Sequence, residues 1–379
     1  MKSAKTKWSA FLFSALAVLV SCAAVLSDDG EDYFPVKQNG KFGYIDKTGK
    51  IVIPPQFDSV VIAQEQGSSF TEGLAAVQVG DKWGYIDKSG KFVIPPKFKQ
   101  IFPPSPFHEG LAQVEVKEDK FIDKTGVEVT KETLRFIDRT GKFVKQLNFI
   151  EETTKFSEGL AKVSQGDKFG YVDKTGRFVI AARFVDAEDF NEGLAAVRLE
   201  DTFEAKYGFI DKTGRMVIQP QFWKAKSFSE GLAAVKTEDN NEGYIDKSGK
   251  IVIAPQFNEV YPFSEGLAKV VVGNKIGFID STGKMAISLQ FDLDMRYISE
   301  NKGNLGFSDG LAVVDIKNES GYKSGYIDKA GKVIIAPEYD WGSDFHSGVA
   351  QVSKGDQPET RKIYYINKTG RIIWEWKAD

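Results

Sequence analysis

Short apolar runs alternate with polar turn residues along the chain from Tyr33 to Trp374. Leu74 to Val79 is followed by Trp83 to Asp87, and then by Phe92 to Ile94 before a Pro pair. Runs of β-branched and aromatic residues bounded by Gly, Pro and Asp predict short strands. No stretch of this region shows the sustained i, i+3, i+4, i+7 spacing of a helix. The pattern therefore predicts an all-β chain.

The same runs recur in the same order, which predicts tandem repeats of one small unit. The phrase Phe-x-Glu-Gly, with Asp309 or Ser347 in place of Glu in the last two copies, starts at eight positions that lie 34 to 49 residues apart: Phe70, Phe107, Phe156, Phe190, Phe228, Phe263, Phe307 and Phe345. A truncated copy precedes them at Phe34 to Phe57. We therefore expect about nine units of three to four short antiparallel strands between residues 33 and 379.

A four-residue turn is expected between the second and third runs of each unit. In Asp87-Lys88-Ser89-Gly90 the Asp suits the first position of a type I turn, and the Gly suits a left-handed last position. The turn glycines are Gly49, Gly90, Gly126, Gly141, Gly176, Gly214, Gly249, Gly283, Gly331 and Gly370. The Pro pair is expected to end the third strand.

A weaker fourth strand is expected after each third strand. Aromatic residues bracket these segments, which are Phe98–Phe107, Phe184–Phe190, Phe222–Phe228 and Phe257–Phe263. Two units carry insertions, Val127–Leu134 and Asp292–Leu305. The first insertion follows an apparent extra copy of the second run, Phe121 to Gly126, before the copy at Phe136 to Gly141. Insertions in repeat arrays map to loops that often form the binding face.

The phrases Glu-Gly-Leu-Ala-Ala-Val and Lys-Trp-Gly-Tyr-Ile-Asp-Lys-Ser-Gly resemble the bacterial WG-repeat family, also called KWG repeats. The Trp-Gly pair stands at Trp83-Gly84, and other copies carry Phe42, Phe169, Tyr207 or Ile276 before the Gly. The resemblance implies a β-repeat fold and an interaction role, with no catalytic residues to carry over. The second phrase also resembles the aromatic hairpins of choline-type cell-wall-binding repeats.

Two architectures accommodate such units. A closed β-propeller takes three or four strands and about 40 residues per blade, whereas an open β-solenoid needs only contacts between neighbours. The chain begins with a half unit and ends on a third run at Ile372 to Trp374. These incomplete ends favour the propeller, because they could complement each other and close a ring.

Residues 1–22 have the features of a signal peptide, with Lys2, Lys5 and Lys7 ahead of an apolar run from Phe11 to Val20. The run ends in a lipobox-like Leu-Val-Ser-Cys, and Cys22 is the chain's one cysteine. We expect lipidation of Cys22, a short linker at 23–32 and a membrane association through the lipid anchor alone. Ordinary cleavage, giving a secreted or periplasmic protein, is the alternative. Both place the mature chain outside the cytoplasm, in the bacterial cell envelope for the anchored form.

The charge balance argues against nucleic acid as a partner. The chain has 50 basic and 53 acidic residues, and removal of residues 1–22 takes away three lysines and no acid. The remaining Lys residues are spread among the turns and form no basic block. The mature chain has no cysteine for disulfides, so core burial must stabilise it.

Few residues are candidates for chemistry. His108 and His346 both occupy the variable position of Phe-x-Glu-Gly and are expected to be exposed loop residues, so no metal or Ser-His-Asp site is expected. Carboxylates recur in almost every unit, which indicates a structural role, since catalysis needs a site only once. Calcium at the turn carboxylates is an alternative, although they lack the pattern of a dedicated loop.

We therefore expect a non-enzymatic, cofactor-free module that binds a protein or a surface polymer. Carbohydrate or peptidoglycan binding by exposed aromatic rings is a second hypothesis, and a propeller-type hydrolase is a third. No particular residue is assigned to a ligand. The tryptophans outside the repeat pattern, Trp223, Trp341, Trp374 and Trp376, are the aromatic residues that the common core explains least.

The turn assignment makes the first prediction. Replacing Gly249 by Ala should destabilise its hairpin by roughly 1 kcal/mol, because an L-residue disfavours positive φ. Thermal unfolding of the variant measures this cost. An unchanged melting temperature would contradict the turn assignment.

Overall fold

The computed structural model describes residues 32–61, 70–99, 103–122, 128–144, 155–293, 306–319, 321–355 and 360–376. The chain divides into two compact units, Met1–Gly30 and Glu31–Asp379. Every described residue belongs to the second unit. The expected signal peptide and Cys22 lie outside the described residues.

The described residues form strands and no helix. The first strands in the chain are β1 (Phe34–Gln38), β2 (Lys41–Ile45), β3 (Ile51–Phe57), β4 (Ser59–Val60), β5 (Leu74–Val79), β6 (Lys82–Asp87), β7 (Phe92–Phe98), β8 (Leu111–Ile122), β9 (Glu128–Asp138), β10 (Leu160–Gln165), β11 (Lys168–Asp173), β12 (Phe178–Phe184), β13 (Asp186–Ala187), β14 (Leu194–Arg198), β15 (Tyr207–Asp211) and β16 (Met216–Phe222). They are followed by β17 (Lys224–Ala225), β18 (Ala233–Lys236), β19 (Glu242–Ile245), β20 (Ile251–Phe257), β21 (Glu259–Val260), β22 (Leu267–Val272), β23 (Lys275–Asp280), β24 (Met285–Asp292), β25 (Leu311–Asn318), β26 (Gly321–Asp328), β27 (Val333–Tyr339), β28 (Trp341–Gly342), β29 (Val349–Lys354), β30 (Lys362–Asn367) and β31 (Ile372–Glu375).

These strands confirm the repeat of short antiparallel strands. We number the repeats 1 to 9 by their first strands, which are β1, β5, β8, β10, β14, β18, β22, β25 and β29. The first strand pairs with the second, and the second pairs with the third in every repeat except repeat 3. The strands β4, β13, β17, β21 and β28, which we call inner strands, are two residues long.

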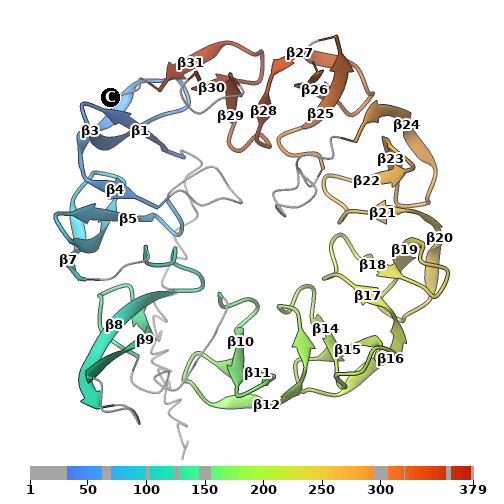
Figure 1. Cartoon of the computed structure of the whole chain (residues 1–379), viewed down its shortest axis with the longest axis horizontal. Coiled ribbons are helices and arrows are strands. Elements are labelled where there is room, and N and C mark those ends of the chain that lie inside the picture. Colours follow the sequence, from blue (N-terminus) through green and yellow to red (C-terminus); the bar gives the residue numbers. More distant parts are fainter. Residues whose placement is uncertain are drawn as a thin grey trace, which may run out of the picture. The chain divides into compact units, whose positions relative to one another are not determined.

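The inner strands confirm the weak fourth strand expected after Phe184, Phe222 and Phe257. Each one leaves its own repeat and joins the sheet of the next repeat, beside that repeat's first strand. Figure 1 shows inner strands such as β17, β21 and β28 toward the centre, and third strands such as β16, β20 and β24 at the circumference. These five inner strands therefore link repeats 1 to 2, 4 to 5, 5 to 6, 6 to 7 and 8 to 9.

The turn between the second and third strands has the expected geometry. Gly249 has φ 84°, and its N–H donates to the carbonyl of Asp246 at 2.9 Å. A Cβ on Gly249 would also lie 2.9 Å from Cγ2 of Ile218 in the preceding repeat. The cost of Gly249→Ala therefore contains a packing contribution in addition to positive φ.

The expectation that the Pro pair ends the third strand is wrong. Strand β7 continues through Pro95 and Pro96 to Phe98, and its pairing with β6 shifts between Trp83 and Tyr85. Proline is tolerated here because it lies in a bulge of the outermost strand, where its missing N–H breaks no ladder hydrogen bond.

The Gly of the Trp-Gly pair lies directly under this bulge. A Cβ on Gly84 would be 2.5 Å from the carbonyl oxygen of Ile94 and 2.8 Å from the nitrogen of Pro96. Equivalent approaches below 3.0 Å to backbone atoms occur at Gly43, Gly170, Gly208, Gly243, Gly277 and Gly325. The pair therefore requires Gly for space, since any side chain would collide with the neighbouring backbone.

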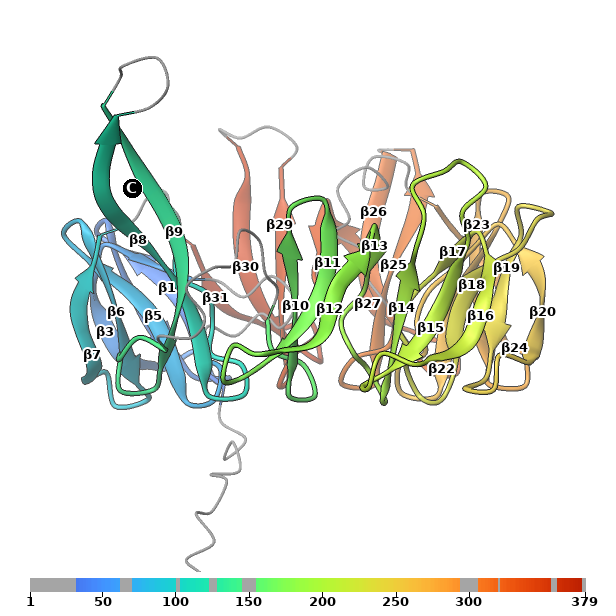
Figure 2. The same cartoon turned by 90° about the horizontal axis from the view of Figure 1, so that it is seen from below.

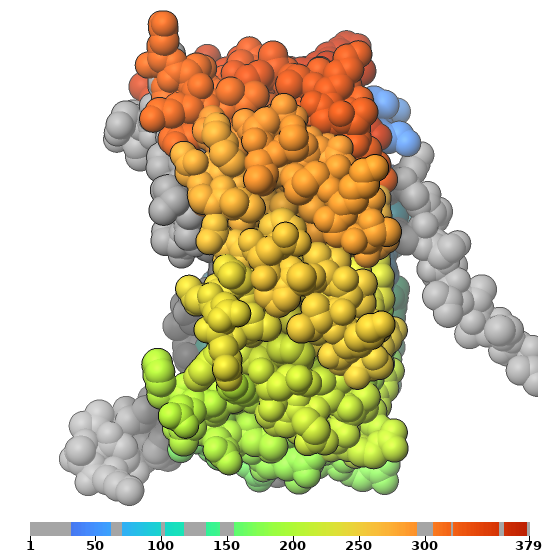
Figure 3. All heavy atoms as spheres, turned by 90° about the vertical axis from the view of Figure 1, so that its right-hand side faces the viewer, coloured from blue at the N-terminus to red at the C-terminus, as the bar shows by residue number. Residues whose placement is uncertain are grey.

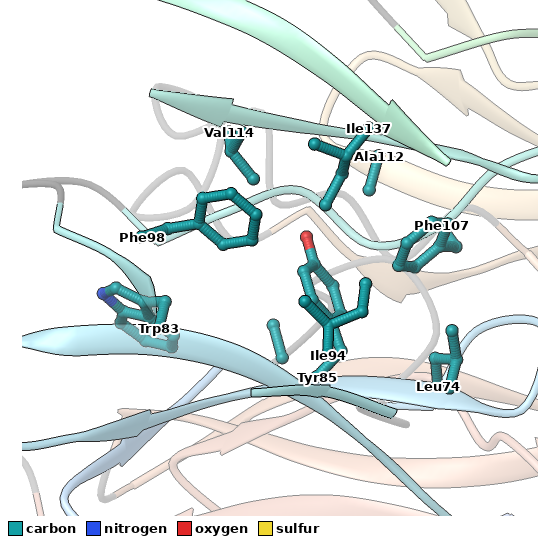
Figure 4. Packing of buried hydrophobic residues seen from close by; sticks show 10 residues of the cluster. Leu74, Trp83, Tyr85, Ile94, Phe98, Phe107, Ala112, Val114 and Ile137 are labelled. Atoms are coloured by element: carbon teal, nitrogen blue, oxygen red, sulfur yellow. The ribbon is translucent and has the colours of Figure 1, made fainter. Parts of the chain in front are cut away.

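The hydrophobic core is divided among the interfaces between successive sheets. In Figure 4, Tyr85 and Ile94 of repeat 2 point toward Phe107, Ala112 and Ile137 of repeat 3. Tyr85 and Phe107 form an edge-to-face pair with centroids 4.8 Å apart, a favoured aromatic geometry. First and second strands such as β5 and β6 are buried on both faces and show little alternation, whereas the third strand β7 exposes Phe92 and Val93.

Repeat 3 departs from the plan. Its strands β8 and β9 are 12 and 11 residues long and form a hairpin that projects beyond the neighbouring sheets in Figure 2. The apparent copy at Phe121 pairs with Val129 near the tip, and the true second strand contains Phe136. The first insertion, Val127–Leu134, thus builds an ordered arm from residue 128 onward. Gly126 lies outside the described residues.

The second insertion begins by joining two repeats. Asp292 of repeat 7 pairs with Asp315 of repeat 8, so β21 to β27 form one seven-stranded sheet. The Asp292 carboxylate also accepts a hydrogen bond from the backbone N–H of Lys317 at 3.1 Å. Residues 294–305 lie outside the described residues. In Figure 3 the yellow and orange repeats follow one another as a continuous filled surface.

The last sheet packs against the first, which gives the propeller-type closure and not an open solenoid. Phe34 and Val36 of β1 share a core with Val349 and Tyr365 of repeat 9, and Gly49 lies against Ile373. The incomplete ends do not exchange strands, however. The first sheet has three strands and the last has four.

A tyrosine hydroxyl supplies one hydrogen bond that an inner strand supplies in other repeats. In repeat 6 the N–H of Lys226 donates to the carbonyl of Ala234 on the first strand. The equivalent carbonyl in β1 belongs to Pro35, and it accepts the hydroxyl of Tyr365 at 3.0 Å. Because Pro35 has no N–H, this edge also exposes no unpaired donor at that position.

The close approach at the Trp-Gly position yields a paired prediction. Gly243→Ala should destabilise the protein by about 3 kcal/mol or more, because its Cβ would lie 2.5 Å from the carbonyl of Ile253. Gly266→Ala should cost only about 1 kcal/mol, since Gly266 has positive φ but open space around it. Urea unfolding of both variants compares them. Equal losses would contradict the steric explanation.

Candidate interaction surface

The repeated Glu residues hold successive sheets together. Glu192 has φ 52°, which places its side chain toward the next repeat, where the carboxylate accepts the N–H of Gly231 at 3.0 Å. The ammonium of Lys247 lies 3.0 Å from the same oxygen. The same carboxylate-to-glycine bond joins Glu72–Gly110, Glu109–Gly159, Glu158–Gly193, Glu230–Gly266, Glu265–Gly310 and Asp309–Gly348. These carboxylates therefore have a structural partner in each of these repeats.

The turn carboxylates are occupied within their own turns. Asp211 accepts hydrogen bonds from the N–H and hydroxyl of Thr213 and from the N–H of Arg215. The hydroxyl of Thr213 is the strongest of the influences that lower the pKa of Asp211 to about 2. Such a carboxylate is ionised at neutral pH and already has its donors. Among the described residues, no group of three His, Cys, Asp or Glu side chains is placed to bind one metal ion.

His346 differs from the exposed loop residue that the sequence suggested. Its Nε2 lies 2.8 Å from the carboxylate of Asp32, at the contact between repeat 9 and the start of repeat 1. The hydroxyl of Ser347 donates to the same carboxylate. The hydrogen bond from His346 lowers the pKa of Asp32 more than burial raises it. His108 is likewise half-buried.

The irregular tryptophans divide into two groups. Trp374 and Trp376 pack against the core that joins the last sheet to the first, so closure of the ring explains them. Trp341 is half-buried in the inner strand β28, opposite Ser353. Trp223 is half-buried just before the inner strand β17 and lies beside an exposed ring.

That exposed ring is Phe203, in the connection between β14 and β15. Its side chain is 95% exposed, the highest among the large exposed hydrophobic residues of the described chain. Its centroid lies 6.2 Å from that of Trp223, and the ammonium of Lys206 lies 5.1 Å from the Trp223 ring centre. Leu199, at the start of the same connection, is 39% exposed. We call Phe203 and Trp223 the aromatic patch.

Trp223 stands at a position where several other repeats have a hydrogen-bonding Asp or Asn. Asp58, Asn258 and Asp340 occupy the equivalent position after the third strand, and each accepts the N–H of a glycine in the first-to-second-strand connection of the next repeat. A tryptophan can make no such bond. Trp223 instead presents an aromatic surface at the end of the sheets where the connections between first and second strands lie, which we call the loop face.

Two lysines, Lys226 and Lys269, surround Tyr261 at the inner strands of repeats 6 and 7. The ammonium of Lys269 lies 3.8 Å from the ring centre of Tyr261, and that of Lys226 lies 5.0 Å from it. Burial lowers the pKa of Lys269 to about 8, although nearby carboxylates, chiefly Asp344, oppose the shift. Lys226 also donates to the carbonyl of Val260 at 2.9 Å. These contacts fasten inner strands of neighbouring repeats to one another.

Sequence reasoning identified Trp223 but missed Phe203. Phe203 lies in a connection of eight residues between β14 and β15, whereas the corresponding connection between β5 and β6 has two. This extra length was the available signal, because an aromatic residue in a lengthened polar connection has no place in the repeated core. The signal is weak, since the spacing of repeats varies for several other reasons.

The repeat pattern matches a known family along most of the chain. The family described as WG containing repeat matches residues 42–83, 83–121, 135–169, 169–203, 207–240, 243–275, 276–302 and 325–357. The chain belongs to the WG containing repeat family. A comparison with curated proteins gives no match.

Solved structures resemble this WG-repeat chain in fold. A crystal structure described as that of the eukaryotic initiation factor aligns with a TM-score of 0.65 and 13% identity, covering 91% of this chain and 95% of the other. BamB from Moraxella catarrhalis aligns with a TM-score of 0.34 and 10% identity, covering 90% and 89%. The WD40 β-propeller domain of Doa1 gives 0.30 and 11%, covering 60% and 82%. At these identities the first likeness concerns the fold alone.

A search of the described residues for a membrane-crossing helix finds none of sufficient length and hydropathy.

The Asp32 contact predicts a pH-dependent stability. Asp32→Asn should lower the stability at pH 7 by about 1 to 2 kcal/mol, because it removes a hydrogen-bonded charge at ring closure. A lowered folded-state pKa stabilises the fold above the unfolded-state pKa of about 3.9 and loses this effect as pH falls through the folded-state pKa. The difference between the two proteins should therefore shrink below about pH 4.

Thermal unfolding from pH 7 to pH 3 measures this difference. Asp167→Asn, at an exposed carboxylate in the connection between β10 and β11, is the matched control. Identical melting temperatures of the wild type and Asp32→Asn at pH 7 would show that the contact adds nothing to closure.

Proposed function

We propose that this WG-repeat chain is an exported, non-enzymatic module that binds a partner protein through its loop face. The aromatic patch carries the proposal. A 95% exposed Phe beside a half-buried Trp is unfavourable in water, and neither ring belongs to the common core of the repeats. Aromatic anchors of this kind supply much of the binding free energy of protein interfaces.

The repeat carboxylates support a binding role over a catalytic one. Each accepts a hydrogen bond from the next repeat, and the turn carboxylates accept hydrogen bonds within their own turns. The repeats thus form a scaffold, and features that occur once distinguish its surface. The aromatic patch and the projecting hairpin of β8 and β9 are two such features of the described chain.

Carbohydrate or peptidoglycan binding is the second candidate function. The observation that favours it is the same pair of rings, because an exposed aromatic face can stack on a sugar ring. Export and a lipid anchor on Cys22 would place either activity at the cell envelope. This location rests on Lys2, Lys5 and Lys7 and on the apolar run that follows them.

A binding screen tests the proposed function. The mature chain, residues 23–379, is immobilised and exposed separately to solubilised envelope proteins, isolated peptidoglycan and a glycan array. We expect a defined protein to be retained and to be lost with Phe203→Ala or Trp223→Ala. Saturable glycan binding that these variants abolish would instead establish the second candidate.

Phe178→Ala is the matched control, since Phe178 is 41% exposed on the third strand β12 and lies outside the patch. Circular dichroism should show that all three variants remain folded. Retention that is unchanged in both patch variants would contradict a role for this surface.

A further inference from the structure

The loops beside the aromatic patch are acidic. Glu200, Asp201 and Glu204 lie with Phe203 in the connection between β14 and β15, and all three are exposed. Glu238 and Asp239 lie in the next connection of the loop face, between β18 and β19, and are exposed as well. The two connections are in contact, because Lys206 pairs with Glu238 while its ammonium lies over the Trp223 ring.

Most of this negative charge has no partner within the described chain. The structure gives Glu200, Asp201, Glu204 and Asp239 no ion pair or side-chain hydrogen bond among the described residues. Lys206 forms an ion pair with Glu238. The guanidinium of Arg198 lies 5.7 Å from the ring centre of Tyr207. Lys224 directly follows Trp223 and lies opposite Lys236, which ends β18 just before the second connection, so both lysines border the patch. The two connections beside the patch, which we call its acidic rim, carry five carboxylates and one lysine.

We propose that the aromatic patch and its acidic rim dock a cationic segment of a partner protein, with an arginine side chain over the Phe203 and Trp223 rings. The face of an aromatic ring attracts a guanidinium, which also stacks on it as a planar group. The surrounding carboxylates supply the complementary charge and accept the guanidinium's remaining hydrogen bonds. Within the chain, the ammonium of Lys206 already lies over the Trp223 ring.

An arginine fits better than a neutral apolar anchor. A purely apolar partner would leave the four unpaired carboxylates facing a desolvated surface, which is costly. A lysine would satisfy the charge but would stack less well, because its ammonium is compact and strongly hydrated. The proposal rests on the proposed protein-binding function and specifies the chemistry of the partner.

Fluorescence anisotropy with labelled synthetic peptides tests the proposal on the full mature chain. One peptide carries several arginines, a second carries citrulline at the same positions, and a third carries lysine. We expect the arginine peptide to bind best, the lysine peptide more weakly, and the citrulline peptide about tenfold or more weakly than arginine. The binding should weaken as salt rises, because the charges involved are exposed.

Two variants separate the rings from the charges. Phe203→Ala should weaken binding of the arginine peptide several-fold. The quadruple change Glu200→Gln, Asp201→Asn, Glu204→Gln and Asp239→Asn should weaken it and flatten its salt dependence. Glu319→Gln is the matched control, since Glu319 is an exposed carboxylate in the connection between β25 and β26.

Equal binding of the arginine and citrulline peptides would overturn the proposal, and so would binding that the quadruple change leaves intact. If the screen retains a protein that needs Phe203 while its binding is insensitive to salt and to the quadruple change, the interaction function stands and the cationic partner does not. If a neutral glycan binds at the patch and no peptide does, both are wrong.

Discussion

The structure depends on the close approach between the glycine of each aromatic-Gly pair and the bulged third strand. At Gly243 a Cβ would lie 2.5 Å from the carbonyl of Ile253 and 2.7 Å from the nitrogen of Pro255. Only a residue without a side chain lets the third strand come this close to the second, and the bulge lets a proline remain in the third strand. The bulge brings the last aromatic residue of the third strand, such as Phe257, back into the core between sheets. From that residue the chain can enter the inner strand of the next sheet.

The stability of the ring is distributed over similar interfaces. The interfaces contain an apolar core. In seven of them, from repeats 2 and 3 to repeats 8 and 9, a carboxylate accepts a glycine N–H of the next repeat. In five of these a Lys or Arg pairs with the same carboxylate. Such contacts between neighbours are typical of repeat proteins. The closure differs because Asp32, His346, Tyr365 and Pro35 replace contacts that the repeat supplies elsewhere. It therefore depends on Asp32, His346 and Pro35, which occur once, and on a repeated tyrosine whose hydroxyl donates to a different carbonyl here.

Function is expected where the repeat is broken. A residue repeated in every unit can be explained by the interface that it builds, as Glu192 is. Trp223 stands where other repeats have a capping Asp or Asn, and Phe203 lies in a lengthened connection. Their position at the loop face, and the acidic residues around them, distinguish the proposed binding surface from the residues that maintain the fold.

The sequence by itself determined the strands, the period, the Asp-to-Gly turns and the weak inner strand, because these depend on local backbone preferences and on the spacing of apolar residues. It also drew attention to Trp223 as a residue outside the pattern. Only the tertiary structure decided that the Pro pair lies within a strand, that Phe121 belongs to a projecting arm and that His346 meets Asp32. It also placed Phe203 beside Trp223 and an acidic connection of the next repeat. These features join residues from different strands or repeats, and the packing of one sheet on another fixes them, whereas a local pattern does not.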